Sequence, residues 1–387
     1  MRDAELRGSW TRPIALVGLV LAAILIAACG SDTVGGAREG ETEVAQSGPL
    51  SGTLAVSNWP GYIDPGKNGE GTLEEFEKET GVAVDYKIDV NDNDQFFGKV
   101  QPLLAEGDSG GRDIMVVTDW MAEKMHNLGY LQDINPDDLP TAFENLRADL
   151  QAPDFDPDRS YSMPWQTGMT GVWVDTAKAP EITSVNDLFD PKYAGKVTML
   201  TEMRDTVPLV MKADGIDPAT ASKEDWLAAI DKIGEAADSG QIRRFTGNDY
   251  TEDLTRGNVV ATIGWSGDAS LISNDDAEWR MPDEGCMLWS DNMVIPVGAP
   301  NTAAALEFMD FVYRPEVQAD IAEWVNYVTP VEGVREILAK RDPKLAQSQL
   351  IFPDAQFTSS CTTQVSPPGD DEDVAEVTEA FEDVKNR

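Results

Sequence analysis

Aromatic residues with acidic or amide neighbours recur where predicted strands and helices begin or end. They fall in residues 58–62, 118–120, 264–268, 289–291 and 326–327, which contain Trp59, Tyr62, Trp120, Trp265, Asp268, Trp289, Asp291 and Tyr327. A single tryptophan is usually a core residue. These segments, however, are turns rich in Gly, Asp and Asn, where the rim of a cleft is a more natural place than a packed interior.

Such a set of side chains can bind an organic cation. Aromatic faces attract ammonium groups and cover methylene chains. Carboxylates supply charge-assisted hydrogen bonds to each nitrogen. We therefore expect a cleft that captures a small, flexible, cationic solute.

The residues that catalysis most often requires are scarce. His126 is the one histidine, no nucleophile motif such as G-x-S-x-G accompanies it, and we interpret it as a surface residue of a helix. The sequence has no C-x-x-C pair, no H-E-x-x-H and no phosphate-binding glycine motif, so we expect no metal and no cofactor. Acidic pairs are plentiful, so a secreted carboxylate-based hydrolase stays an alternative to a non-enzymatic binding protein.

The composition is that of a folded but strongly acidic protein. Its 387 residues are 41% hydrophobic and 26% charged, and 69 Asp and Glu against 30 Lys and Arg give a net charge of −39. Such a field repels nucleic acid and attracts cations. It is equally compatible with a surface adapted to salt or crowding. We expect no nucleic-acid partner.

The N-terminus predicts export and lipid attachment. Arg2, Arg7 and Arg12 precede the apolar residues 14–28, a run shorter than the ~20 residues of a membrane-spanning helix. That run ends in Ala-Ala-Cys29-Gly, which resembles a bacterial lipobox, although an ordinary signal peptide is the alternative. We predict a signal peptide over residues 1–28, a lipid on Cys29, and a flexible tether over residues 29–52 that holds the protein to the membrane.

Two further cysteines, Cys286 and Cys361, follow in the predicted mature chain. An oxidising compartment permits a disulfide between them, and closing so long a loop would stabilise the fold by ~4 kcal/mol in the chain-entropy model. Two buried thiols are the alternative.

Strand and helix patterns alternate along the remaining chain. Strands are predicted at residues 54–57, 82–88, 113–117, 196–199, 259–264 and 291–295, with a new run of strand signal near Tyr161. Helices are predicted from Thr72 to Gly81 and at residues 94–105, 119–128, 223–235, 269–275, 301–325 and 373–384, the longest broken at Pro315. This alternation favours parallel sheets covered by helices in two lobes, with ligand binding at the carboxyl ends of the strands and hinge closure around it.

The chain resembles the spermidine/putrescine-binding proteins of bacterial ABC transporters. The resemblance runs from about residue 54 to residue 364, on N-W-x-x-Y at 58–62, the strand and turn at 113–125, Tyr-Ser-Met-Pro at 161–164, Trp-Ser-Gly at 265–267, Trp-Ser-Asp at 289–291 and Tyr-Val-Thr-Pro at 327–330. It implies an α/β, two-lobed periplasmic-binding-protein type II (Venus-flytrap) fold with a hinge and an inter-lobe cleft. The chain crossings would fall near Tyr161 and Asp291. Lobe 1 would comprise residues 53–160 and 292–335, and lobe 2 residues 161–291 and 336–387.

The resemblance also implies which residues bind the ligand. Carried over by position, the cleft would be lined by Trp59, Tyr62, Trp120, Trp265, Trp289 and Tyr327. Thr118 and Gln364 would offer polar contacts, and Asp291 would hold an amine in the middle of the ligand. The implied partners are a polyamine and an ABC transporter permease, and we expect a monomer. Another solute in the same fold, such as an amino acid, a quaternary amine or a metal complex, is the main alternative, and a purely structural lipoprotein is a further one.

One pair of family residues is missing. The family places two acids three residues apart after the strand at 196–199, and here Met203 and Thr206 stand at those positions. Glu202 and Asp205 lie one residue earlier, also three apart. A shift of one residue would restore the grip on a terminal amine, and Asp268 could contribute to it.

Overall fold

The computed structural model describes residues 42–66 and 69–386, all of which belong to one unit, Ala37–Arg387. The predicted signal peptide and the predicted lipid site at Cys29 lie outside the described residues. Within the described ranges, none of the helices combines the length and the apolar character that a bilayer crossing requires.

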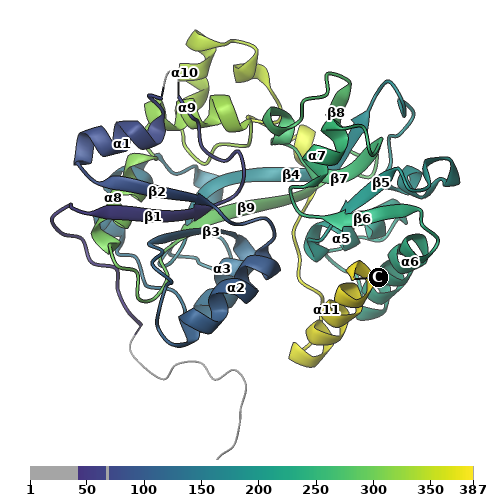
Figure 1. Cartoon of the computed structure of the whole chain (residues 1–387), viewed down its shortest axis with the longest axis horizontal. Coiled ribbons are helices and arrows are strands. Elements are labelled where there is room, and N and C mark those ends of the chain that lie inside the picture. The colour runs from purple at the N-terminus through teal and green to yellow at the C-terminus, as the bar shows by residue number, and fades with distance from the viewer. Residues whose placement is uncertain (1–41, 67–68, 387) are drawn as a thin grey trace, which may run out of the picture. The chain divides into compact units, whose positions relative to one another are not determined.

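One continuous sheet organises the fold (Figure 1). Its order is β2-β1-β3-β9-β4-β7-β5-β6, and short strands β10 and β8 pair with β9 and β4. The strands are β1 Thr53–Asn58, β2 Ala83–Ile88, β3 Ile114–Thr118, β4 Met163–Asp175, β5 Val197–Leu200, β6 Ile242–Thr246, β7 Ala261–Trp265, β8 Ala277–Arg280, β9 Met287–Val294 and β10 Thr362–Thr363.

The two ends of the sheet are parallel and its centre is antiparallel. At one end β1 pairs in parallel with β2 and β3, and at the other β5 pairs in parallel with β6 and β7. The long strand β4 runs antiparallel to β9 and β7, and β9 runs antiparallel to β3. The predicted parallel sheets are therefore present as two halves, and β4 and β9 join them.

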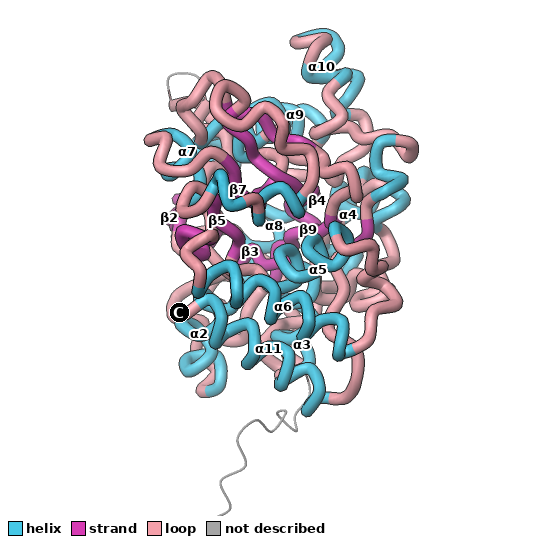
Figure 2. Tube along the Cα trace, turned by 90° about the vertical axis from the view of Figure 1, so that its right-hand side faces the viewer, coloured by secondary structure: helices cyan, strands magenta, loops and turns pink. Residues whose placement is uncertain are grey.

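Helices cover both halves. They are α1 Thr72–Thr80, α2 Asn93–Ala105, α3 Asp119–Asn127, α4 Pro140–Asn145, α5 Met203–Ala213, α6 Lys223–Asp238, α7 Tyr250–Thr255, α8 Thr302–Phe311, α9 Pro315–Val325, α10 Val334–Arg341 and α11 Asp371–Lys385. Figure 2 shows α2, α3, α6 and α11 along one side of the strands. Helices α1, α3 and α8 pack on β2, β3 and β1, and α5, α6 and α7 pack on β5, β6 and β7. We call β1–β3 with their helices the first lobe, and β5–β7 with theirs the second lobe.

Helix α1 illustrates how local sequence fixes an element. Its N-cap is Gly71, one residue before the predicted start, and the Gly71 N–H donates to the Glu74 carboxylate at 3.0 Å. Gly81 ends the helix as predicted, in the left-handed conformation at φ 75°, which residues with a side chain rarely adopt. Phe76, fully buried, packs its ring against Phe308 of α8 at 5.2 Å.

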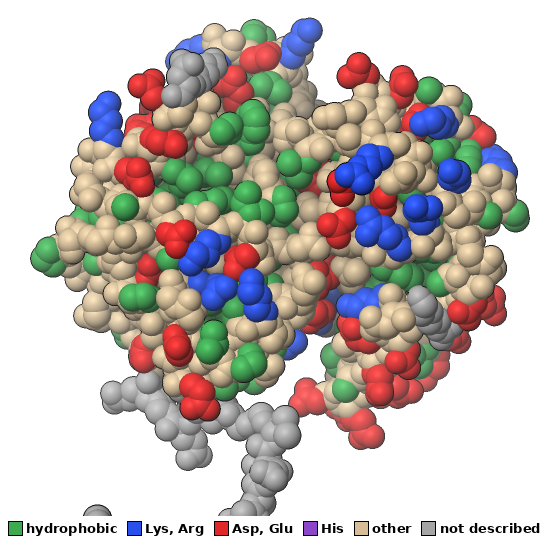
Figure 3. Space-filling model, in the orientation of Figure 1, with side chains coloured by type: hydrophobic (Ala, Val, Ile, Leu, Met, Phe, Trp, Pro, Cys, Tyr) green, Lys and Arg blue, Asp and Glu red, His purple; other side chains and the backbone are tan. Residues whose placement is uncertain are grey.

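The acidic C-terminal helix α11 packs on α6 of the second lobe. Lys223 Nζ donates to Asp373 Oδ1 at 2.6 Å and to Glu376 Oε2 at 2.8 Å. Phe381 is 1% exposed, and its ring lies 6.1 Å from that of Phe245. Acidic side chains gather over this helix in the space-filling view (Figure 3), so its apolar face is inward and its charged face is in solvent.

Two sequence interpretations were wrong. The helix predicted at 269–275 is only a 3-10 turn, Asp268–Leu271, because the Asp268 side chain points inward to three hydrogen-bond donors. His126 is not a freely solvated surface residue. It is half-buried, with its ring stacked on Tyr161 at 3.8 Å and 6° between planes.

Candidate functional site

A cavity lies where the two lobes meet. The residues that line it are Trp59, Pro60, Tyr62, Asn93, Thr118, Glu202, Asp205, Asn248, Trp265, Asp268, Trp289, Asp291, Tyr327 and Gln364. The structure thus brings eleven of the twelve predicted binding residues to one place. That they hold a ligand stays a prediction.

The sheet explains this convergence. Trp59 and Tyr62 follow β1, Thr118 ends β3, and Trp265 ends β7. Glu202 and Asp205, at the start of α5, follow β5. The carboxyl ends of strands in an open α/β sheet are where ligands bind. Here the strand ends of both lobes face one space, closed off by Trp289 and Asp291 on the central strand β9.

The aromatic rings touch one another edge to face. Trp59 of the first lobe lies 5.8 Å from Trp265 of the second, with 76° between ring planes. Tyr327 lies 5.2 Å from Tyr62 and 5.4 Å from Trp289. Each of the five rings is less than 8% exposed. Because rings from both lobes meet across the cavity, the structure is a closed form.

Asp291 lies in the middle of this polar network. Its Oδ1 accepts from the Thr118 hydroxyl at 2.7 Å, and its Oδ2 accepts from the Tyr62 hydroxyl at 2.8 Å. Thr118 Oγ1 in turn accepts from Asn93 Nδ2 at 2.8 Å. Burial raises the pKa of Asp291 from 3.8 to about 7, although both hydrogen bonds oppose the change. Its carboxylate therefore lacks a positive partner.

Asp268 has a similar setting in the second lobe. It accepts hydrogen bonds from the Tyr250 hydroxyl, from Tyr327 at 2.6 Å and from Asn248 at 3.1 Å. Burial raises its pKa to about 6, against the lowering effect of those donors. The three donors fix the carboxylate orientation toward the cavity wall.

Glu202 and Asp205 are the acids that reach the cavity after β5. Glu202 Oε1 accepts from the Asn93 backbone N–H at 3.0 Å and from Asn93 Nδ2 at 3.2 Å. Asp205 accepts from Trp265 Nε1 at 2.9 Å and from Gln364 Nε2 at 2.6 Å. Burial raises the pKa of both acids.

The residues at the family positions do not reach this space. Thr206 turns its hydroxyl to the Leu200 carbonyl at 2.8 Å, and Met203 is buried and is not a lining residue. Glu202 and Asp205, one residue earlier, are the acids of this segment that line the cavity.

The ionisable side chains that line the cavity are mainly acidic. Four carboxyl groups line it, from Glu202, Asp205, Asp268 and Asp291, and its lining includes no lysine, arginine or histidine. Buried acids without a cation nearby are costly to ionise, which is why their pKa values rise. In the described part of the chain no three His, Cys, Asp or Glu side chains are placed to hold a metal ion. The four carboxyl groups stand on three separate elements, the start of α5, the turn after β7 and strand β9, which suits a ligand with more than one positive group.

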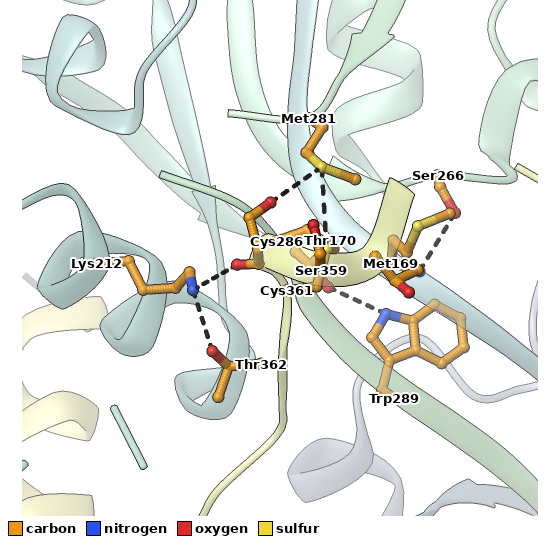
Figure 4. The surroundings of a disulfide bond; sticks show 12 residues. Met169, Thr170, Lys212, Ser266, Met281, Cys286, Trp289, Ser359, Cys361 and Thr362 are labelled. Carbon is orange, nitrogen blue, oxygen red and sulfur yellow. Dashed lines mark hydrogen bonds between the residues drawn. A yellow bond between two sulfur atoms is a disulfide. The ribbon is translucent and has the colours of Figure 1, made fainter. Parts of the chain in front are cut away.

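A disulfide fixes one wall of the cavity (Figure 4). Cys286 and Cys361 are bonded, as predicted, and the adjoining β10 pairs with β9 at Met287 and Leu288. The Gln364 N–H then donates to the Leu288 carbonyl at 2.8 Å. Trp289 Nε1 donates to the Thr170 hydroxyl at 3.0 Å in the same region. The crosslink thus positions two lining residues that are far apart in sequence.

Trp120 is the predicted residue that the cavity does not include. It lies on α3, two residues after Thr118, with its ring 3.9 Å from the guanidinium carbon of Arg204. A protein cation already covers this indole.

Three lining residues were missed in the sequence: Pro60, Asn93 and Asn248. Pro60 lies inside the N-W-x-x-Y motif and could have been included with it. Asn93 is the first residue of α2, and Asn248 follows β6, a strand that the sequence patterns did not predict. An isolated asparagine next to a helix start gives no signal beyond capping.

Comparisons with known proteins agree with this geometry. The profile of the bacterial extracellular solute-binding proteins matches residues 72–347. The spermidine/putrescine-binding periplasmic protein of Escherichia coli K12 is 29% identical over 79% of this chain and 84% of its own.

Solved structures extend the agreement to the fold. A Listeria monocytogenes protein assigned to spermidine/putrescine ABC transport superposes with a TM-score of 0.74 at 27% identity, over 87% of this chain and 99% of that one. The spermidine/putrescine substrate-binding protein PotD of Streptococcus pneumoniae superposes with a TM-score of 0.68 at 24% identity, over 87% and 99%. The two-lobed periplasmic-binding-protein fold is thereby confirmed. The chain belongs to the bacterial extracellular solute-binding proteins.

Proposed function

We propose that this protein captures a polyamine outside the cell membrane and delivers it to an ABC transporter permease. One observation carries the proposal: four buried carboxyl groups and five aromatic rings line a single cavity whose lining has no basic residue. A polyamine offers two or more ammonium groups joined by methylene chains. The carboxylates match the ammonium groups, and the ring faces match the methylenes.

The alternatives fit this lining less well. An amino acid brings a carboxylate, which would enter a cavity with four acids and no cation to receive it. A quaternary amine needs rings but cannot donate hydrogen bonds to carboxylates. A compact metal complex would present its charge at one point, whereas these acids stand on three separate elements.

Delivery requires a cavity that opens and closes. The lobes are held together by hydrogen bonds from Asn93 of α2 to Glu202, and from Thr201 to Asp92. We infer that the hinge lies in β4 and β9, with lobe boundaries at 160/161, 291/292 and 335/336. Small-angle X-ray scattering tests the motion, because putrescine should reduce the radius of gyration of the ligand-free protein. An unchanged radius would contradict closure on binding.

Location and assembly are part of the same proposal. The E. coli relative is named a periplasmic protein, and we infer that this chain is likewise exported. A lipid on Cys29 would hold it at the membrane, beside the permease that receives the ligand. We also infer a monomer, in which one chain supplies all the residues that line the cavity.

Isothermal titration calorimetry with putrescine, spermidine, spermine, γ-aminobutyrate and choline tests the function. We expect one site per chain for the polyamines and no heat from the other two. A ligand at 100 times its Kd stabilises the fold by ~2.7 kcal/mol, so the melting temperature provides a second readout. Mass spectrometry of the recovered ligand distinguishes a binder from a hydrolase: intact polyamine is expected, and cleavage products would refute the proposal.

A further inference from the structure

The stack of Arg204 on Trp120 lies immediately outside the ligand cavity. Trp120 comes two residues after Thr118, and Arg204 lies between Glu202 and Asp205, so both members of the stack adjoin lining residues. Trp120 belongs to α3 of the first lobe and Arg204 to α5 of the second. Their contact therefore exists only when the lobes are closed.

The surroundings of Arg204 resemble the cavity, because an aromatic ring and acidic side chains lie around the guanidinium. Its guanidinium carbon is 3.9 Å from the indole ring, and its Nε donates only a long hydrogen bond, 3.4 Å, to Ser366. Burial lowers the pKa of Arg204, and the negative charges of Asp94, Glu202 and Glu123 act in the opposite direction. Asp94 is instead paired with Lys124, at 3.6 Å, and the Lys124 ammonium lies 5.9 Å from the same indole ring. An aromatic face among carboxylates is thus occupied by the protein's own cation.

Asn93 connects the two lobes at the residues that precede the stack. Asn93 Nδ2 donates to Thr118 Oγ1 at 2.8 Å and to Glu202 Oε1 at 3.2 Å. Thr118 and Glu202 line the cavity and each stands two residues before a member of the stack, so an ammonium group that reached Trp120 would meet the guanidinium. Like charges at such a separation repel, and the indole face is already covered.

We propose that Arg204 is a specificity-determining residue that limits the length of the ligand by filling an additional ammonium subsite on Trp120. This inference rests on the proposed function, since it presupposes that the cavity binds polyamines. It predicts that the protein favours putrescine or spermidine over spermine. Removing the guanidinium would free the indole face that it covers for the terminal ammonium of a longer chain, while Lys124 Nζ stays 5.9 Å from the ring.

The test compares Kd values for putrescine and spermine by calorimetry in the wild-type protein, Arg204→Ala and Arg204→Lys. In Arg204→Ala we expect the ratio of the spermine Kd to the putrescine Kd to fall by about tenfold, the worth of one ammonium on an aromatic face with a carboxylate. Arg204→Lys keeps a cation at the site and should keep the wild-type ratio. Adding Trp120→Ala to Arg204→Ala should remove the gain.

The controls separate the possible failures. Lys192→Ala removes a cation that is half-exposed and paired with Glu181 and Asp190, away from the cavity, and should leave the ratio unchanged. If Arg204→Ala does not fold, as judged by circular dichroism, Arg204→Gln keeps the stem without the charge and replaces it. If the neutral variants bind both amines with the wild-type ratio of spermine Kd to putrescine Kd, the proposed role of Arg204 is overturned and the proposed function stands. No polyamine binding by the wild-type protein overturns the proposed function itself.

Discussion

The Tyr62 hydroxyl donates a 2.8 Å hydrogen bond to Asp291, a residue 229 positions further along the chain. The bond ties the loop after β1 to the central strand β9. It also holds the carboxylate beside the Tyr62 and Tyr327 rings, which lie 5.2 Å apart. The acid and the aromatic wall are therefore positioned by the same contact, and Asp291 is the residue on which cation binding should depend most.

Asp291→Asn should weaken putrescine binding by roughly ten- to a hundredfold. The amide keeps the size of the side chain but loses the charge, and a hydrogen bond to a charged group contributes about 1.5–3 kcal/mol. Calorimetry measures the effect. Asp231→Asn, on the exposed face of α6, is the matched control and should bind as the wild type does. Equal affinity in both variants would place the ammonium group elsewhere.

Affinity for polyamines should fall as the pH is lowered from 8 to 5. Burial raises the pKa of Asp291 to about 7 and that of Asp268 to about 6, so both acids take up protons over this range in the empty cavity. A cation must then displace a proton from each to form its ion pairs. Calorimetry in buffers of different ionisation enthalpy should also detect the released protons. A pH-independent Kd would contradict the assignment.

The ligand-free protein should show the opposite trend in stability. Between 3.8 and about 7, folded Asp291 holds a proton that the unfolded chain has released, so lowering the pH through this window stabilises the fold. The contribution is at most about 1.4 kcal/mol per pH unit for each such acid. Urea unfolding at pH 5, 6, 7 and 8 measures it. In Asp291→Asn the unfolding free energy should depend less steeply on pH. The same pH dependence in the variant and the wild type would disprove the raised pKa of Asp291.

Gly247→Ala should impair closure without destabilising the open protein. A Cβ at Gly247, after β6, would stand 2.1 Å from the backbone oxygen of Asn91, in the loop before α2. Since these residues belong to opposite lobes, the methyl group would keep the lobes apart, and we expect at least about a tenfold loss of polyamine affinity. The unfolding free energy without ligand should not change.

Gly98→Ala is the matched control for that substitution. No atom lies within 4 Å of a Cβ at Gly98, which is inside α2. Alanine there should stabilise the helix by about 0.5–1 kcal/mol and leave binding intact. If Gly247→Ala binds as tightly as Gly98→Ala, the contact between the lobes is not needed for capture.

Replacing both Cys286 and Cys361 by alanine should lower the unfolding free energy by ~4 kcal/mol. The bond closes a loop of 75 residues, and the crosslink limits the entropy of the unfolded chain. Binding should weaken as well, because Gln364 and Trp289 lose their shared support. Urea unfolding, compared with the untreated and the reduced wild type, provides the measurement. Equal midpoints for all three samples would show that the disulfide is not formed in the protein.

Cys29→Ser should release the protein from membranes in a bacterial host. Serine cannot carry the thioether-linked lipid, whereas the rest of the signal sequence is unaltered. Partition between Triton X-114 and water, followed by immunoblotting, distinguishes the two forms. A wild-type protein found only in the aqueous phase would favour the ordinary signal peptide.

The sequence predicted most of the cavity because its aromatic residues stand next to strand ends. Trp59 directly follows β1 and Trp265 ends β7, so the place of each ring is visible in the order of the chain. The sequence left the shift to Glu202 and Asp205 open, because the helix that begins at Met203 was not predicted and the side chains that face the cavity depend on it.

What the sequence could not supply depends on contacts between the lobes. Trp120 looked like a wall residue, but Arg204 reaches it only across the closed interface. Asn93 lies at the cavity because its backbone N–H donates a hydrogen bond to the Glu202 carboxylate, 109 positions further along the chain. The antiparallel centre of the sheet was also missed. A pattern of apolar residues does not reveal the direction in which a strand runs, and β4 and β9 run antiparallel to each other at the centre.

Three of the ten tryptophans, Trp59, Trp265 and Trp289, line one cavity between the lobes. Indole emission responds to nearby charge and to water, and opening the lobes would change both for all three at once. The protein should thus report its own occupancy through intrinsic fluorescence, with no dye attached. Binding of the solute can therefore be followed optically on the unmodified protein.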